Sequence, residues 1–229
     1  TYLEKTWNQK SENRQVSIVE AMNFRLDASY QLDANNSIGA NFGFLRNPKQ
    51  TWNGDMSSSI LQNEELSENS DSHADFFWQK NNLSSNIYYV GKIGKLCIDF
   101  NTDWLWSKEY QNDVTKEQYQ EVGMNAQSQT AHSLTNKDYH LLASKLVLSY
   151  PLLGGNLSLG GEYSNTHRTS KYQVVPTNLV SDDNSRITES MTSSFLTYSR
   201  DFGNLSLEAG MRYEYIDFNY YEYGKYVPG

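Results

Sequence analysis

The sequence predicts an all-β protein in which about eight long strands form four hairpins of an antiparallel up-and-down meander. Three observations lead to this prediction. Apolar and polar residues alternate with a period of two, which places them on opposite faces of strands. Short turn sequences divide the alternating stretches into pairs. These turns recur at intervals of roughly 50 to 60 residues, so the repeating unit is a long hairpin followed by a long connection.

The first hairpin covers residues 24–47. Residues 24–32 alternate between apolar and polar side chains, and the alternation resumes over residues 38–44. Between them lies Asp33-Ala34-Asn35-Asn36, a turn sequence, because Asn and Asp tolerate left-handed backbone and bond to their own main chain. Asn47-Pro48 is expected to end the second strand, since proline cannot donate a hydrogen bond to a sheet.

The other three hairpins follow the same plan. Their turns are predicted at residues 91–94, 151–155 and 201–204. Their strands are predicted at residues 83–90 and 96–106, then 139–150 and 157–164, then 186–200 and 205–215. The strand at 186–200 alternates least regularly, because Phe195 and Leu196 fall on opposite faces.

Loop lengths then favour one kind of β protein. The polar stretches 47–82, 107–138 and 173–185 are predicted to be long loops, whereas the other connections are short turns. Long strands with short turns at one end and long loops at the other are typical of a transmembrane-type β-barrel, either a complete small one or part of a larger one. In such a barrel the apolar face meets lipid and the polar face lines the lumen. An aromatic girdle is expected where strands leave the membrane, at Trp104, Trp106, Tyr150, Tyr213, Tyr215, Tyr220, Tyr221 and Tyr223.

Composition excludes several other classes. A net charge of −8 argues against a nucleic-acid partner, because little positive charge is free to neutralise phosphates. The single cysteine, Cys97, excludes an intramolecular disulfide framework and a multi-cysteine metal site. No apolar run approaches the roughly 18 residues that a transmembrane helix needs. A mean hydropathy of −0.71 fits a barrel, since half of each strand is polar.

A soluble alternative shares the same alternation. In a lipocalin-like barrel the apolar faces would pack inward, and Leu96, Ile98 and Phe100 would line a dry cavity for an apolar ligand. A soluble sandwich is equally compatible with the pattern.

A late hairpin resembles a known family. Residues 191–215, and above all Gly210-Met211-Arg212-Tyr213-Glu214, are similar to barrel hairpins of TonB-dependent receptors. They most resemble the related outer-membrane β-barrel family common in Bacteroides-like bacteria. Pro151-Leu152 before Gly154-Gly155 is similar to another hairpin of that family.

The resemblance implies a cell outer-membrane receptor and transporter of about 22 strands that takes up a nutrient ligand. Its long loops would be extracellular and its short turns periplasmic, with outer-membrane lipid around it. Its implied partners are a plug domain, an inner-membrane energising complex and a surface lipoprotein. Residues 1–229 contain no plug-like segment and end in Pro228-Gly229 without a terminal aromatic. They are therefore expected to form a single all-β segment, an internal slice of a larger barrel. A complete small barrel and a non-transporting adhesive surface barrel stay as alternatives.

Two groups of residues are candidates for ligand contact. Phe77 and Trp78 follow an acidic stretch (residues 64–75) and are predicted to form the aromatic tip of an exposed loop. Arg212, flanked by Glu208 and Glu214 on the polar face, is predicted to form a charged cluster in the lumen. Other charged residues predicted for the polar face are Arg25, Asp27, Asp99, Asp103, Lys145 and Glu162.

No catalytic, metal or cofactor site is predicted. His73, His132, His140 and His167 lie outside the motifs of nucleophile elbows and zinc proteases, so no enzyme activity is expected. The segment 181–185 lacks the ligand spacing of a calcium loop. Cys97 is assigned no chemistry.

Overall fold

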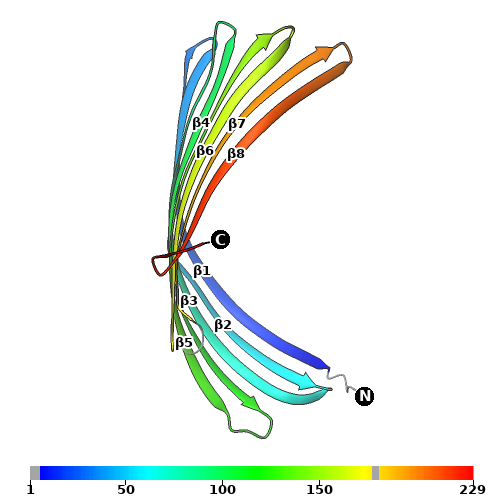
Figure 1. Ribbon diagram of the computed structural model, residues 1–229. Helices are drawn as coiled ribbons and strands as arrows, with labels where there is room; N and C mark the ends of the chain where they lie inside the picture. The colour runs from blue at the N-terminus through cyan, green and yellow to red at the C-terminus, as the bar shows by residue number, and fades with distance from the viewer. Residues whose placement is uncertain (1–5, 177–180, 229) are drawn as a thin grey trace, which may run out of the picture.

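The computed structural model describes residues 6–176 and 181–228. These residues form one antiparallel sheet whose nine strands follow one another in chain order (Figure 1). No helix among them is long and apolar enough to cross a membrane. The strands are β1 (Trp7–Asp33), β2 (Asn36–Gln62), β3 (Glu65–Ile93), β4 (Leu96–Glu121), β5 (Gln127–Leu152), β6 (Gly155–Val175), β7 (Asp183–Phe202), β8 (Leu205–Glu222) and the short β9 (Lys225–Val227). The all-β, up-and-down prediction is confirmed.

Four tight turns join the strands at one end of the sheet, which is uppermost in Figure 1 and is called the turn end below. They lie at residues 34–35, 94–95, 153–154 and 203–204, so all four predicted hairpins are confirmed. Gly94 and Gly203 have φ angles of 61° and 66°. A positive φ in a two-residue turn is the geometry of the hairpin turns that match strand twist, and glycine adopts it without strain.

The predicted long loops are wrong. β2 and β3 continue through residues 47–82 to a tight turn at Asn63-Glu64, and β4 and β5 continue through residues 107–138 to a turn at residues 122–126. Within the third predicted loop, β6 runs to Val175 and β7 starts at Asp183, and residues 177–180 lie outside the described residues. This opposite part of the sheet is called the far half.

The far half holds together through polar pairs between neighbouring strands. The Ser57 hydroxyl donates to Asp71 across β2 and β3 at 2.6 Å, and the Ser70 hydroxyl donates to Glu117 across β3 and β4 at 2.6 Å. Polar residues predominate on both faces of these strands, which removes the alternation that identifies a strand. The sequence pattern therefore looks like that of a loop, although the backbone is extended.

Pro48 does not end β2, contrary to expectation. The β2–β3 register shifts between Asn47 and Gln50, so Pro48 sits in an irregularity of the strand. The side-chain amide of Gln79 on β3 donates to the Pro48 carbonyl at 3.0 Å. A bulge is a place where a missing backbone N–H costs little, because no ladder partner is required there.

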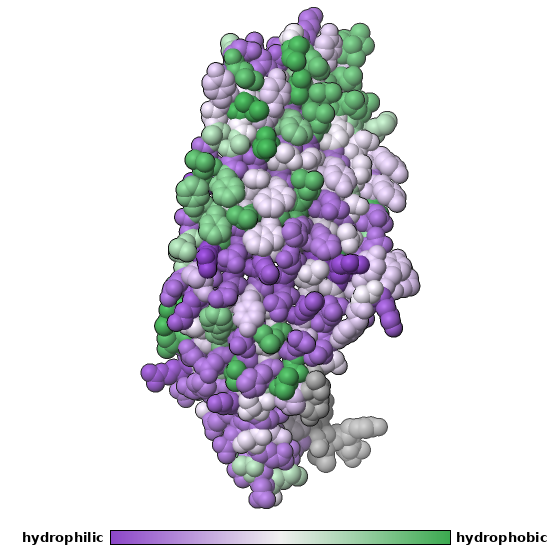
Figure 2. All heavy atoms as spheres, turned by 90° about the vertical axis from the view of Figure 1, so that its left-hand side faces the viewer, coloured by the Kyte–Doolittle hydropathy of each residue, from purple (hydrophilic) through white to green (hydrophobic). Residues whose placement is uncertain are grey.

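The sheet is curved, and its two faces differ in chemistry. Figure 2 shows the convex face, where hydrophobic side chains gather towards the turn end and hydrophilic ones cover the far half. By strand register, one face of the turn-end half carries most of the apolar residues. This apolar belt includes Phe24, Leu26, Tyr30, Ile38, Phe42, Ile87, Ile98, Phe100, Trp104, Leu142, Leu146, Leu159, Tyr163, Leu196, Met211 and Tyr213. The belt is therefore convex, and the alternate residues are concave.

The sheet has no hydrophobic core of its own. Val174 is the one buried hydrophobic residue in the described part of the chain, while belt residues such as Leu159 and Met211 are 53% and 73% exposed. A single apolar layer of this size needs to be covered. Lipid covers it in outer-membrane barrels, whose strands present an apolar band outward.

Both long edges of the sheet are open. β1 pairs only with β2, and β8 pairs with β7 and, over Tyr220–Glu222, with β9. The described residues of β1 and β8 do not meet, so these strands do not close a small barrel.

Candidate functional site on the concave face

An ionic network crosses the concave face in the turn-end half. Glu162 on β6 accepts from Lys145 on β5, with Nζ to Oε1 at 3.0 Å, and from Arg212 on β8, with Nη2 to Oε2 at 2.6 Å. Arg212 Nε also lies 2.5 Å from Glu214 Oε1. The Ser193 hydroxyl on β7 completes the set, donating to Glu162 Oε2 at 3.3 Å. Four neighbouring strands are thus joined through one carboxylate.

An aromatic ring lies within this network. Phe195 on β7 packs over Gly160 on β6, where an added Cβ would lie only 2.0 Å from the ring. Lys145 Nζ and Arg212 Cζ are each 5.7 Å from the ring centroid, within the range of cation–π attraction. Phe195 therefore faces the polar side, which accounts for the irregular alternation of β7.

The charged cluster predicted around Arg212 is present, but one of its two carboxylates differs from the prediction. Arg212 and Glu214 form an ion pair as expected, but the second carboxylate is Glu162 and not Glu208. Glu162 lies 50 residues before Arg212 in the sequence, two strands away, and sequence spacing alone does not reveal this contact.

Phe77 and Trp78 do not form a loop tip, because both lie within β3. Their side chains point to opposite faces. Trp78 faces the concave side with its register partners Gln50 and Gln111, and Phe77 faces the convex side, where its ring centroid lies 6.4 Å from that of Tyr110. Their assignment as ligand contacts stays a prediction, and only Trp78 shares a face with Arg212.

Trp78 belongs to an aromatic cluster in the far half of the concave face. The ring centroids of Trp52 and Phe76 are 4.6 Å apart, and those of Phe76 and Trp78 are 6.3 Å apart with nearly parallel planes. Trp52 Nε1 donates to Gln15 at 3.0 Å. Sequence reasoning misses Trp52, because its surroundings have the pattern of a loop. Only the register of β2 against β3 brings it beside Phe76.

A pocket of about 280 Å³ adjoins this cluster and is lined by Asn47, Gln50, Trp78, Lys80, Glu109 and Gln111. Lys137 Nζ lies 3.3 Å from Glu109 Oε1. Two residues beyond Gln111, Asp113 is 8% exposed and accepts from Gln111 at 2.6 Å and from Ser133 at 3.3 Å. Burial raises the pKa of the Asp113 carboxyl above its ordinary value, against the lowering effect of these two hydrogen bonds.

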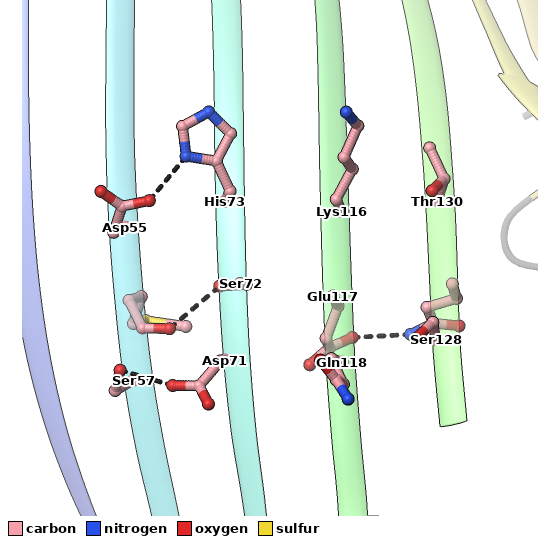
Figure 3. Close-up of a pocket in the computed structure, with 12 residues that line it drawn as sticks. Asp55, Ser57, Asp71, Ser72, His73, Lys116, Glu117, Gln118, Ser128 and Thr130 are labelled. Carbon is pink, nitrogen blue, oxygen red and sulfur yellow. Dashed lines mark hydrogen bonds and ion pairs between the residues drawn. The ribbon is translucent and has the colours of Figure 1, made fainter. Parts of the chain in front are cut away.

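A larger, more open pocket of about 540 Å³ lies on the convex side of the far half (Figure 3). Here His73 Nδ1 is 2.6 Å from Asp55 Oδ1 across β2 and β3, and His73 Nε2 is 3.4 Å from Asp75 Oδ2. The hydrogen bond to Asp55 is the main reason that the pKa of His73 is raised. No group of three or more His, Cys, Asp or Glu side chains in the described ranges is arranged to hold a metal ion.

Solved structures that this chain resembles at low similarity include a transporter and an outer-membrane receptor. The ferric citrate transporter FecA in its unliganded form is 10% identical, with a TM-score of 0.38 over 89% of this chain and 39% of that one. The alcaligin outer-membrane receptor FauA from Bordetella pertussis is 11% identical, with a TM-score of 0.36 over 95% of this chain and 38% of that one. This chain thus spans about two fifths of either protein. It has no match among curated proteins.

The family comparison is more decisive. The family described as "Outer membrane protein beta-barrel family" matches residues 90–226, well over half of the 229 residues. The match includes β4 to β8, with both hairpins that form the ionic network. The apolar convex belt, the polar concave face and this match agree, and the chain belongs to the outer membrane protein beta-barrel family.

Proposed function

We propose that this chain is a wall segment of an outer-membrane receptor and transporter that takes up a nutrient ligand, of the TonB-dependent kind. The ionic network on the concave face carries the proposal. A small closed barrel fills its interior with side chains, and charges there would be buried at high cost. Lys145 and Arg212 instead carry their charges on the face that would point into the barrel. Charges held in this way suit the wall of a wide, wet lumen.

The open edges support a larger barrel. Strand edges left unpaired in a membrane expose backbone N–H and C=O groups that lipid cannot satisfy. The edges of β1 and β8 therefore need further strands, whether from the same protein or from another chain. A barrel wide enough for a plug domain has about 22 strands.

The length of the far half supports one orientation of the sheet across the outer membrane. A membrane crossing takes about 9–11 residues of a tilted strand, whereas β2 and β3 have 27 and 29 residues. Polar residues predominate on both faces of the excess, which belongs in water. We place the far half outside the cell and the short turns in the periplasm, because long extensions are extracellular in barrels of this kind.

Two alternatives to a transporter are a soluble lipocalin-like barrel and a non-transporting adhesive barrel. The lipocalin-like alternative required the apolar residues to face inward, but they lie on the convex face of a family-assigned outer-membrane sheet (Figure 2). A non-transporting adhesive barrel has the same fold as a transporter, so an uptake experiment is needed to distinguish the two functions.

The experiment compares cells with and without the full-length protein. Both strains grow in a complex medium, and the compounds left in the medium are measured by mass spectrometry. A transporter predicts that at least one nutrient stays in the medium of the deletion strain, that a plasmid copy restores its removal, and that a protonophore blocks it. Identical depletion by the two strains, with a loss of surface attachment in the deletion strain, would identify an adhesive barrel instead.

A further inference from the structure

Unpartnered polar atoms lie on three adjacent strands of the concave face. Among the described residues, three buried side-chain atoms have no hydrogen-bond partner: Asn47 Oδ1, Trp78 Nε1 and Asp113 Oδ1. Strand register puts them on the adjacent strands β2, β3 and β4, and two of the three residues line the pocket of about 280 Å³. Buried polar atoms in native proteins nearly always have partners, so such a cluster calls for an explanation.

Apolar and polar groups meet at this pocket. The Trp52–Phe76–Trp78 aromatic cluster provides ring faces beside it, while the amides of Gln50 and Gln111 provide donors and acceptors in its wall. A ligand pocket typically combines an apolar surface with a few convergent polar groups. The volume of this pocket, about 280 Å³, is just below the usual range of about 300–1,000 Å³.

The charges around the pocket cancel. Lys80 and Glu109 are the two charged residues that line it, and their charges are opposite. The site therefore has no excess charge with which to select an anionic or cationic ligand, and uncharged groups must provide its specificity.

We propose that this pocket binds a neutral saccharide, with one sugar ring against Trp78. A hydroxyl group both donates and accepts, so hydroxyls of the saccharide can accept from Trp78 Nε1 and donate to Asn47 Oδ1 in the pocket wall. Asp113 Oδ1 lies further along β4, where a neighbouring sugar unit can donate to it. The C–H face of the ring packs on the aromatic surface. The long side chains of Gln50, Lys80 and Gln111 change rotamer to admit it. The inference deepens the proposed function, on which it rests for placing this pocket at the extracellular entrance of the lumen.

The test measures binding to the full-length protein purified in detergent. The probes are maltohexaose, cellohexaose, chitohexaose, xylohexaose and mannohexaose, with ferric citrate as a charged probe. Binding is followed by isothermal titration calorimetry. At least one hexasaccharide is expected to bind in preference to ferric citrate.

Variants then locate the site. Trp78→Ala should weaken saccharide binding by about tenfold or more, because it removes both the ring face and the N–H. Trp78→Phe keeps a ring and should lose less, which measures the contribution of the N–H. Phe77→Ala is the matched control, since it changes the adjacent residue on the opposite face and should leave binding unchanged. Heat-dependent migration on gels checks that each variant is folded.

The outcomes separate the inference from the proposed function. Binding that is lost in Trp78→Ala and kept in Phe77→Ala supports the saccharide site, even where cells take up no saccharide and the transport proposal fails. No binding of any of the five saccharides, or binding that is indifferent to Trp78→Ala, overturns the saccharide site, even where uptake of another nutrient upholds the transport proposal.

Discussion

The Phe195 ring on β7 occupies the space that a side chain on Gly160 of β6 would need. An alanine Cβ at residue 160 would come within 2.0 Å of the ring Cζ atom. The glycine thus lets an aromatic ring lie between Lys145 and Arg212 on the concave face. The arrangement of the ionic network depends on this contact.

Gly160→Ala should therefore destabilise the protein by about 1–3 kcal/mol, the usual cost of overpacking. The ring has to leave its place, and both cations lose their contact with it. Gly161→Ala is the control, because the nearest atom to its added Cβ is the Ser193 carbonyl oxygen at an ordinary 3.6 Å. Thermal unfolding of the full-length protein in detergent measures both. Equal unfolding midpoints for the two variants would contradict the packing role of Gly160.

Glu162→Gln should remove the common partner of Lys145 and Arg212. Unfolding free energy is expected to fall by about 1–2 kcal/mol, a moderate value because both cations are partly exposed and screened. The deficit should shrink in high salt. Glu208→Gln, on the same face of β8 but outside the network, is the comparison. If it destabilises the protein as much as Glu162→Gln, general charge loss and not the network is responsible.

How far the sequence predicts this structure differs between the two halves. Turn chemistry and strict alternation predict the hairpins and both faces of the turn-end half, since one face there is apolar and the other polar. In the far half, pairs such as Ser59 and Asn69, whose hydroxyl-to-amide hydrogen bond is 2.8 Å long, lie on strands with two polar faces. Those strands have no period-two signal, so the pattern around Trp78 indicates a loop. The link between Glu162 and Arg212 depends on the lateral order of strands, which local patterns do not contain.

His73 should titrate above its ordinary pKa because Asp55, and to a lesser degree Asp75, favour its charged form. A histidine whose pKa is higher in the folded state stabilises that state below its ordinary pKa of about 6.5, and this contribution is lost as the pH rises through the folded-state value. Asp55→Asn should move the His73 midpoint downwards. NMR titration of isotope-labelled histidines measures it in the wild-type and Asp55→Asn proteins. A His73 midpoint unchanged by Asp55→Asn would refute the pairing as the cause.

Asp113 should make the protein less stable as the pH rises, whereas a carboxyl group with a lowered pKa has the reverse effect. Burial raises its pKa, so the charged form is disfavoured in the folded protein, and stability should increase as the pH falls through the raised value. Asp113→Asn removes this charge and should make the protein at least as stable at neutral pH, with a flatter pH profile. Unfolding midpoints between about pH 4 and pH 8, compared with those of Asp71→Asn, provide the check. If the Asp113→Asn protein is less stable across the whole range, the carboxylate is needed for folding.

The convex face should contact lipid and the concave face should contact water. The proposed function depends on this assignment of the two faces. Native Cys97 lies on the concave face, and its neighbour Ile98 belongs to the convex belt. A nitroxide spin label is attached to Cys97 in one sample. In the other sample it is attached to the cysteine introduced by Ile98→Cys in a protein that also carries Cys97→Ser. Both proteins are full-length and are measured in lipid vesicles.

Relaxation of each label by oxygen, which concentrates in lipid, is compared with its relaxation by a water-soluble nickel chelate. We expect a lipid signature, with high oxygen and low nickel accessibility, for the label at position 98 alone. A lipid signature at position 97 would contradict the assignment of the two faces.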